Sequence, residues 1–191
     1  MNLKSVLQQD GIILDEPFYQ NVLRYKEHLH KWNKIHNLTG AKTDELIDKF
    51  IYDAVYPVSF LPKINLAMDI GTGAGFPGMI LAFALPKTHF TLVEPLQKRA
   101  SFLQFIKADL ALKNVTIKNC RVEELEPVPY DLVTSRAVTQ TKILMNLSKP
   151  FLKKESLLLF YKGERVFEEV DSSLKYQVIQ TQNRHYLLIE S

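Results

Sequence analysis

The apolar positions in the first third of the chain recur with a helical period. From Asp15 to about His36 they fall near one face of a helix: Phe18, Val22, Leu29 and Trp32. From Thr43 to about Tyr56 a second stripe does the same: Leu46, Ile47, Phe50, Ile51 and Val55. Pro57 and Pro62 then interrupt the pattern. We therefore interpret residues 1–62 as a small N-terminal helical lobe.

After residue 62, short apolar runs alternate with helical patterns. The expected strands are Leu66–Ile70, Phe90–Val93, Val115–Ile117, Leu132–Thr134 and Leu157–Tyr161. The expected helices between them are Gly78–Ala84, Arg99–Ala111 and Lys142–Leu147. This alternation predicts an α/β domain over residues 63–191, with a mainly parallel sheet and helices on both faces. At the end, Tyr176–Thr181 and Tyr186–Ile189 predict a terminal antiparallel hairpin.

Composition adds few constraints. The 191 residues are 46% hydrophobic and 24% charged, and the net charge of +3 permits binding to a polyanion without requiring it. No apolar run approaches the roughly 20 residues of a membrane span, and the first residues do not resemble a secretory signal. Cys120 is the only cysteine, so an internal disulfide and a multi-cysteine metal site are excluded. We expect a cytoplasmic protein.

A glycine-rich stretch directly after the first expected strand carries the strongest sign of a ligand. It reads Asp69-Ile-Gly71-Thr-Gly73-Ala-Gly75-Phe-Pro-Gly78. Glycines at a strand-to-helix turn accept positive φ and let a ligand lie against the main chain. In a doubly wound sheet, such a turn lies in the crevice where an adenosyl ligand would bind.

This motif alone leaves two cofactor classes open. Part of it matches G-x-G-x-x-G, the dinucleotide fingerprint of nicotinamide-dependent oxidoreductases, and a purely structural turn is a further alternative. Glu94, about 20 residues on, could hold a ribose diol in either class. Asp69 favours a cationic cofactor, because its carboxylate could meet an amine but would repel a pyrophosphate. Asp69 could instead accept backbone N–H bonds within the loop, and both roles can coexist.

Several separated blocks are more specific than the glycines. They are Trp32-Asn33-Lys34-Ile35-His36-Asn37-Leu38-Thr39, the Gly71–Gly78 loop, Lys98-Arg99-Ala-Ser-Phe102-Leu103, Arg121-Val122-Glu123-Glu124, Ser135-Arg136-Ala137, Lys162-Gly163 and Arg184-His185. Together they closely resemble the bacterial 16S rRNA guanine-N7 methyltransferases of the glucose-inhibited division B (GidB) family. The resemblance spans nearly the whole chain. It implies a Rossmann-like class I methyltransferase fold that uses S-adenosyl-L-methionine on 16S rRNA of the small ribosomal subunit.

The resemblance also implies site residues. Gly71, Gly73 and Phe76 would line the cofactor pocket, with Asp69 and Gly75 in the same loop. Glu94 would hold the ribose, Val122 and Glu123 would frame the adenine, and Arg136 would close the site. Alternatives remain for three of them: Val122 as ordinary core, Glu123 as a solvated acid, and Arg136 paired with a structural carboxylate.

The residues after the fourth expected strand bear on the reaction. Many amino-directed methyltransferases carry Asn/Asp-Pro-Pro-aromatic there, whereas this chain has Thr134-Ser135-Arg136-Ala137. Cytosine-C5 transfer needs a cysteine nucleophile, and Cys120, the sole candidate, is more typical of a small buried hydrophobe. Guanine N7 exposes a lone pair, so its methylation needs alignment and exclusion of water. We therefore expect no catalytic general base.

Basic residues near predicted strand ends and helix starts are the candidate RNA contacts. They are Lys98, Arg99, Arg121, Arg136, Lys162, Arg165 and Arg184. If they converge, they form a phosphate-attracting rim around the cofactor mouth, although several could be ordinary surface charges. His28, His30 and His36 have no evident metal-ligand partners, so we expect no metal, and we expect a monomer. A non-catalytic RNA-binding protein that retains the fold is a further alternative.

Overall fold

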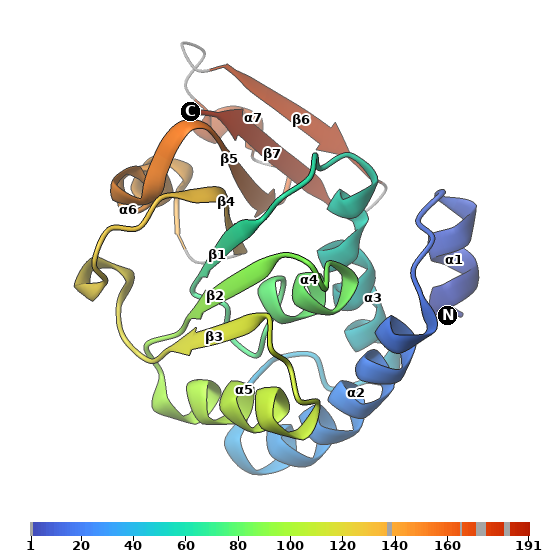
Figure 1. Ribbon diagram of the computed structural model, residues 1–191. Coiled ribbons are helices and arrows are strands. Elements are labelled where there is room, and N and C mark those ends of the chain that lie inside the picture. The colour runs from blue at the N-terminus through green and yellow to red at the C-terminus, as the bar shows by residue number, and fades with distance from the viewer. Residues whose placement is uncertain (1, 137–138, 165, 171–174, 182–183) are drawn as a thin grey trace.

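The molecule is built on one seven-stranded sheet (Figure 1). The computed structural model describes residues 2–136, 139–164, 166–170, 175–181 and 184–191. Its strands are β1 (Leu66–Ile70), β2 (His89–Val93), β3 (Val115–Lys118), β4 (Tyr130–Arg136), β5 (Leu152–Lys162), β6 (Tyr176–Gln180) and β7 (His185–Glu190). Their spatial order is β3-β2-β1-β4-β5-β7-β6. The first five are parallel, and β7 and β6 add the antiparallel hairpin that the sequence predicts.

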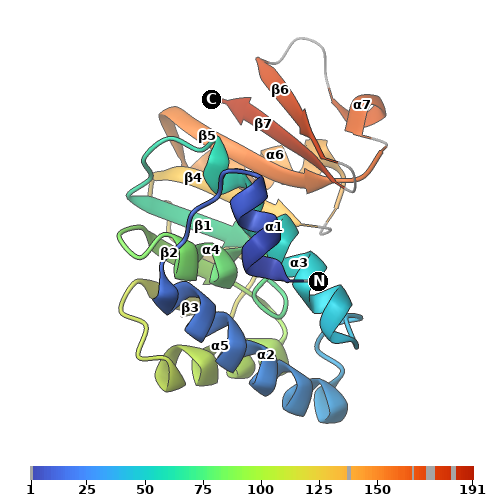
Figure 2. The ribbon, with the colours of Figure 1, turned by 90° about the vertical axis from the view of Figure 1, so that its right-hand side faces the viewer.

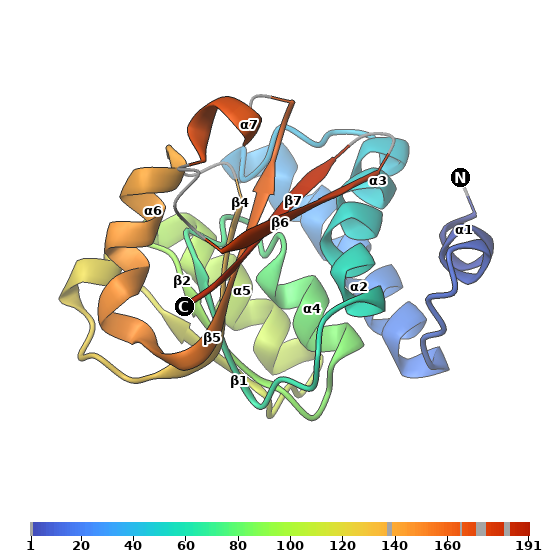
Figure 3. The same cartoon turned by 90° about the horizontal axis from the view of Figure 1, so that it is seen from above.

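Helices cover both faces of this sheet (Figure 3). The α-helices are α1 (Leu3–Gln9), α2 (Glu16–His36), α3 (Asp44–Val55), α4 (Gly78–Ala84), α5 (Gln97–Asp109), α6 (Thr141–Ser148) and α7 (Val166–Glu169). Short 3₁₀ turns are η1 (Tyr56–Ser59), η2 (Val122–Glu124) and η3 (Lys149–Phe151). Along β1 and β2, Ala67 and Leu92 pack in the core under α2–α5, whereas Met68 and Val93 pack in the core under α6. This two-residue alternation is what a sheet buried on both faces requires.

The two long N-terminal helices begin where their capping residues predict. The Asp15 carboxylate accepts a hydrogen bond from the backbone N–H of Phe18 (3.3 Å), and the Thr43 hydroxyl accepts one from that of Leu46 (3.3 Å). Each bond satisfies a donor that has no partner within the helix. Helix α1, which we did not predict, is too short to show a clear period and is anchored by the fully buried Leu7.

Helices α2 and α3 share their hydrophobic core with the sheet domain. Phe18 and Tyr25 of α2 and Ile51 of α3 belong to the same buried cluster as Met79 of α4 and Phe102 of α5. Figure 2 shows α2 running alongside α5 and α3 beside α4. The division into residues 1–62 and 63–191 stays a prediction, but one continuous core joins the two parts. No helix within the described residues is long and apolar enough to cross a membrane.

Candidate cofactor pocket

A pocket of about 420 Å³ opens at the carboxyl ends of β1, β2 and β4. Strand β1 lies between β2 and β4, so the chain winds one way to β3 and then the other way to β5. Such a switch point is where doubly wound sheets bind ligands. The pocket is lined by Leu38, Thr39, Gly40, Gly71, Thr72, Gly73, Ala74, Phe76, Glu94, Pro95, Leu96, Arg99 and Arg136.

The glycine loop forms one wall of this pocket and is held from two sides. The backbone N–H of Gly71 donates to the carbonyl of Val93 (2.9 Å), and the Tyr25 hydroxyl donates to the carbonyl of Ala74 (2.6 Å). Gly73 has φ of 64°, and a Cβ added there would meet no atom within 4 Å. Its bare main chain therefore leaves room for a ligand, as the sequence predicts.

Glu94 joins the loop to the end of β2. Its side chain is almost fully buried, with 2% exposure, and accepts hydrogen bonds from the backbone N–H groups of Gly73 (2.8 Å) and Leu96 (2.9 Å). The Asn119 amide donates to the Glu94 carbonyl (2.9 Å) and fixes the main chain behind it. Since each carboxylate oxygen can accept two hydrogen bonds, Glu94 retains acceptor capacity toward the pocket.

Asp69 lies beneath the loop. It is fully buried, and its carboxylate accepts hydrogen bonds from the backbone N–H of Gly78 and the hydroxyl of Thr134, both at 2.8 Å. Burial raises the pKa of Asp69 to about 6, against the lowering effect of these bonds. A Cβ on Gly78 would come within 2.7 Å of the Asp69 side chain, so only glycine lets α4 approach β1 this closely. Asp69 thus serves the loop as an acceptor, and its contact with a cofactor amine stays a prediction.

Arg136 brings a buried positive charge to the pocket. Its guanidinium carbon lies 4.2 Å from the ring centroid of Phe50 and 5.1 Å from that of Phe76. Burial lowers its pKa, and Nη1 has no hydrogen-bond partner among the described residues. The alternative for Arg136 was a pairing with a structural carboxylate. The buried carboxylate near it, Asp53, is bound by Arg184 instead (2.8 Å). A buried cation with an open donor is suited to an anionic ligand group.

Four of the predicted cofactor residues do not line the pocket in the described structure: Asp69, which lies beneath the loop, and Gly75, Val122 and Glu123. Val122 is buried in the core under α6, Glu123 is exposed on the η2 turn, and Gly75 packs against Met79 of α4. Their contacts with a cofactor stay predictions. Ala137, from one of the motif blocks, lies outside the described residues.

Most of the predicted RNA-binding cations make hydrogen bonds or ion pairs within the protein. Lys98 donates to the carbonyl of His36 (3.0 Å), and Arg99 donates to that of Leu38 (3.1 Å) and also lines the pocket. Lys162 pairs with Glu169 at 2.8 Å, and Arg184 pairs with Asp53. Arg121 is exposed, and Arg165 lies outside the described residues. RNA contact by these side chains stays a prediction.

Sequence reasoning missed the second wall of the pocket, the loop between α2 and α3. Leu38, Thr39 and Gly40 line the pocket from this side. The Asn33 side chain fixes the loop, because its oxygen accepts a hydrogen bond from the backbone N–H of Thr39 (2.9 Å). The Trp32–Thr39 block supported the family resemblance, but its period showed only a helix end, so nothing local placed this loop beside the glycines.

Two of the three histidines of α2, His28 and His30, each contact one carboxylate, and the ring of His36 lies against Trp32. His28 lies 3.0 Å from Asp109, and His30 lies 2.7 Å from Asp44. Within the described ranges, no group of three or more His, Cys, Asp or Glu side chains is placed to hold a metal ion.

The chain has the fold of the class I S-adenosylmethionine-dependent methyltransferases. A putative O-methyltransferase from Klebsiella pneumoniae aligns over 99% of this chain and 96% of its own length, with a TM-score of 0.66 and 14% identity. M. jannaschii TYW2, solved in complex with AdoMet, aligns over 78% of this chain and 75% of its own, with a TM-score of 0.58 and 15% identity. These similarities confirm the predicted fold.

Sequence comparison then gives the family. The family model described as "rRNA small subunit methyltransferase G" (GidB) matches residues 18–189. The ribosomal RNA small subunit methyltransferase G of Wolinella succinogenes is 45% identical, over 97% of this chain and 96% of its own. That of Aliarcobacter butzleri is 40% identical, over 98% of both. The chain belongs to this family, which confirms the predicted resemblance and argues against the nicotinamide-dependent alternative.

Proposed function

We propose that this chain transfers a methyl group from S-adenosyl-L-methionine to N7 of a guanine in 16S rRNA of the small ribosomal subunit. The observation that carries the proposal is the composition of the pocket. Among its described lining residues, Glu94 is the only carboxylate, and none is histidine, cysteine, lysine or tyrosine. Both oxygens of Glu94 already accept backbone hydrogen bonds. Its remaining acceptor capacity is assigned here to the cofactor ribose, which leaves no other base among the described lining residues. Such a pocket suits a nucleophile that carries no proton.

The described contacts support a role for each wall. Gly71 and Gly73 leave main chain open to the cofactor, Glu94 would accept from its ribose hydroxyls, and Phe76 would pack beside it. The open Nη1 of Arg136 would meet an anionic group at the site. S-adenosylmethionine supplies the methyl group on a sulfonium centre, and the N7 lone pair forms the new bond as the sulfur–methyl bond breaks. The protein's part is alignment of the reacting atoms and exclusion of water.

Other nucleophiles fit this pocket less well. Cys120, which a cytosine-C5 mechanism would need, is not among the described lining residues, and burial raises the pKa of its thiol. We further propose that the protein acts in the cytoplasm as a monomer and without a metal ion.

The test is methylation of small subunits and of free 16S rRNA prepared from cells that lack this modification, with labelled cofactor. We expect label at guanine N7, detected as an aniline-sensitive strand break. At saturating RNA and cofactor, the single-turnover rate should stay nearly flat from about pH 6.5 to 8.5, because no acid–base pair titrates in the step. A steep bell-shaped profile, or label on another atom, would overturn the N7 assignment. RNA binding without transfer would favour a non-catalytic protein.

A further inference from the structure

A second pocket, of about 310 Å³, lies where α2 passes into the loop before α3. It is lined by His30, Asn33, Lys34, Asn37 and Lys42. We propose that this pocket, which we call the α2–α3 pocket, binds a backbone phosphate of the substrate RNA. The inference rests on the proposed function, since it assigns a further contact to the same RNA. None of its five residues was among the RNA contacts expected from sequence.

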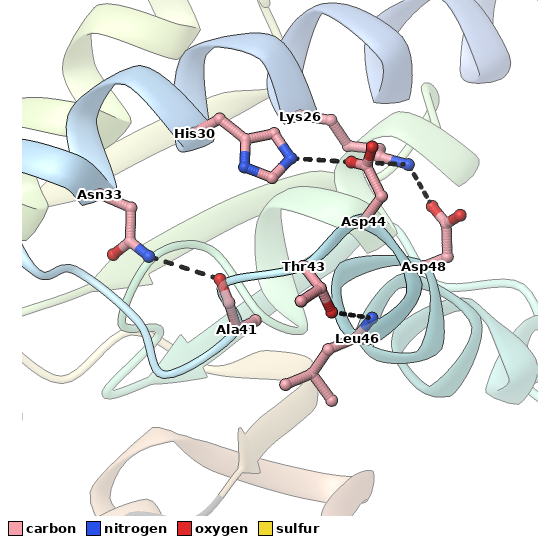
Figure 4. Close-up of polar contacts among 8 residues, drawn as sticks. All are labelled: Lys26, His30, Asn33, Ala41, Thr43, Asp44, Leu46 and Asp48. Atoms are coloured by element: carbon pink, nitrogen blue, oxygen red, sulfur yellow. Dashed lines mark hydrogen bonds and ion pairs between the residues drawn. The ribbon is translucent and has the colours of Figure 1, made fainter.

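The charge around the α2–α3 pocket is positive once the ion pairs are counted. Two nearby carboxylates on α3 share one lysine: Lys26 lies 2.5 Å from Asp48 and 3.5 Å from Asp44, and Asp44 also lies 2.7 Å from the ring of His30 (Figure 4). Lys26, Lys34 and Lys42 together outnumber these two carboxylates. Lys34 and Lys42 are exposed, and neither has a hydrogen-bond or ion-pair partner among the described residues. Two ammonium groups without ion-pair partners at the rim of one pocket attract an anion, and a phosphate can accept from both.

The α2–α3 pocket is held in shape by the end of α2. The Asn33 amide donates to the carbonyl of Ala41 (3.4 Å, Figure 4), and its oxygen accepts from the backbone N–H of Thr39. Asn37 ends the helix in the left-handed conformation, with φ of 49° and its backbone N–H bonded to the Asn33 carbonyl. These bonds fix the loop that bears Lys42 relative to the helix that bears Lys34. A phosphate would therefore enter a site that is already ordered, which reduces the entropy lost on binding.

The same loop is a wall of both pockets. Leu38, Thr39 and Gly40 line the cofactor pocket, while Asn37 and Lys42 on either side of them line the α2–α3 pocket. The two pockets are thus neighbours that share this loop. An RNA strand that delivered its target base to the cofactor pocket would pass its backbone near this loop. That adjacency favours RNA phosphate over an unrelated anion as the occupant.

The test compares two double variants that remove the same charge. Lys34→Ala/Lys42→Ala alters the α2–α3 pocket. Lys63→Ala/Lys87→Ala is the matched control, because these exposed lysines precede β1 and β2 at the opposite, amino-terminal edge of the sheet. Binding of each protein to unmethylated small subunits and to free 16S rRNA is measured over a series of salt concentrations. Cofactor affinity and melting temperature are measured on the same samples.

We expect Lys34→Ala/Lys42→Ala to weaken RNA binding by roughly 2- to 30-fold at low salt, from two exposed ion-pair contributions. The slope of log K against log salt should become shallower by about 0.7–0.9, the value for one phosphate. The control should keep the parent slope, and all variants should keep cofactor affinity. An unchanged slope in the pocket variant, or equal changes in both variants, would overturn the inference. Methyl transfer by the unaltered protein tests the proposed function separately, since the slopes are compared whether or not transfer occurs.

Discussion

Replacement of Glu94 by glutamine tests the assignment of the cofactor ribose. The carboxylate accepts two backbone N–H bonds, from Gly73 and Leu96. Glutamine has a similar shape but only one acceptor oxygen, so its amide N–H₂ must face one of these N–H donors. The variant loses the negative charge and weakens the hold on the glycine loop at the same time.

The expected magnitude follows from the hydrogen bond proposed to the ribose. A hydrogen bond to a charged group contributes about 1.5–3 kcal/mol. Glu94→Gln should therefore weaken cofactor binding by about 10- to 150-fold. Isothermal titration calorimetry with S-adenosylhomocysteine measures this directly, and urea unfolding checks that the variant is folded.

Loss of affinity alone would not separate a ribose contact from a loosened loop. Analogues of S-adenosylhomocysteine that lack the 2′- or the 3′-hydroxyl make the distinction in a double-mutant cycle. If Glu94 accepts from a hydroxyl, removing that hydroxyl should weaken binding in the parent protein and have little further effect in the variant. The coupling energy should then reach about 1.5 kcal/mol or more. Additive effects for both analogues, or unchanged affinity in a folded variant, would refute the ribose assignment.

Two further predictions concern stability. The pKa of Asp69 is raised by burial to about 6, against about 3.9 in an unfolded chain, so its stabilising contribution is complete below pH 3.9 and is lost as pH rises through 6. Over that range the free energy of unfolding should fall by up to about 3 kcal/mol more in the parent than in Asp69→Asn; parallel urea-unfolding curves would contradict this. Arg184→Met should destabilise the protein by about 3 kcal/mol, because Asp53, with 1% side-chain exposure, would lose its ion-pair partner. Adding Asp53→Asn should restore much of that loss in thermal unfolding, and no recovery would mean that the pair does not set the stability.

The parts of the fold that sequence predicted well are those set by local pattern. Strand β1 and helix α4 have the predicted bounds, because their apolar runs stop at clear turn residues. Strand β5 begins five residues before the predicted start. Its first residues include the exposed Lys153, Lys154 and Glu155, which show no apolar alternation. The strand is irregular here, because Glu155 has φ of 69° and the register with β4 shifts between Tyr130 and Leu132. This part of β5 depends on its pairing with β4, which a local pattern does not contain.

In the candidate site, too, local sequence pattern predicts some contacts, and the packing of distant segments determines the others. The glycine loop and Glu94 are joined by one short crossover, so their proximity follows from a βαβ unit. Lys98 and Arg99 looked like RNA contacts because they are cations at a helix start. Their actual partners are carbonyls 62 and 61 residues earlier, at the last residue of α2 and in the loop after it. Only the packing of α2 against α5 brings these groups together, so no spacing in the sequence could have shown it.

The hydrogen bond from Tyr25 to the Ala74 carbonyl affects how much conformational entropy the pocket loses when it binds a ligand. Tyr25 is fully buried, and its ring packs against Phe76, Phe83 and Phe102. A loop tethered to such a residue can loosen only when the surrounding core opens, so its amide hydrogens should exchange with solvent as slowly as those of the central strands. The wall that would receive the adenosyl group is therefore ordered before the ligand arrives. Mutations in α2 that disturb the packing of Tyr25 should therefore make the glycine loop less ordered.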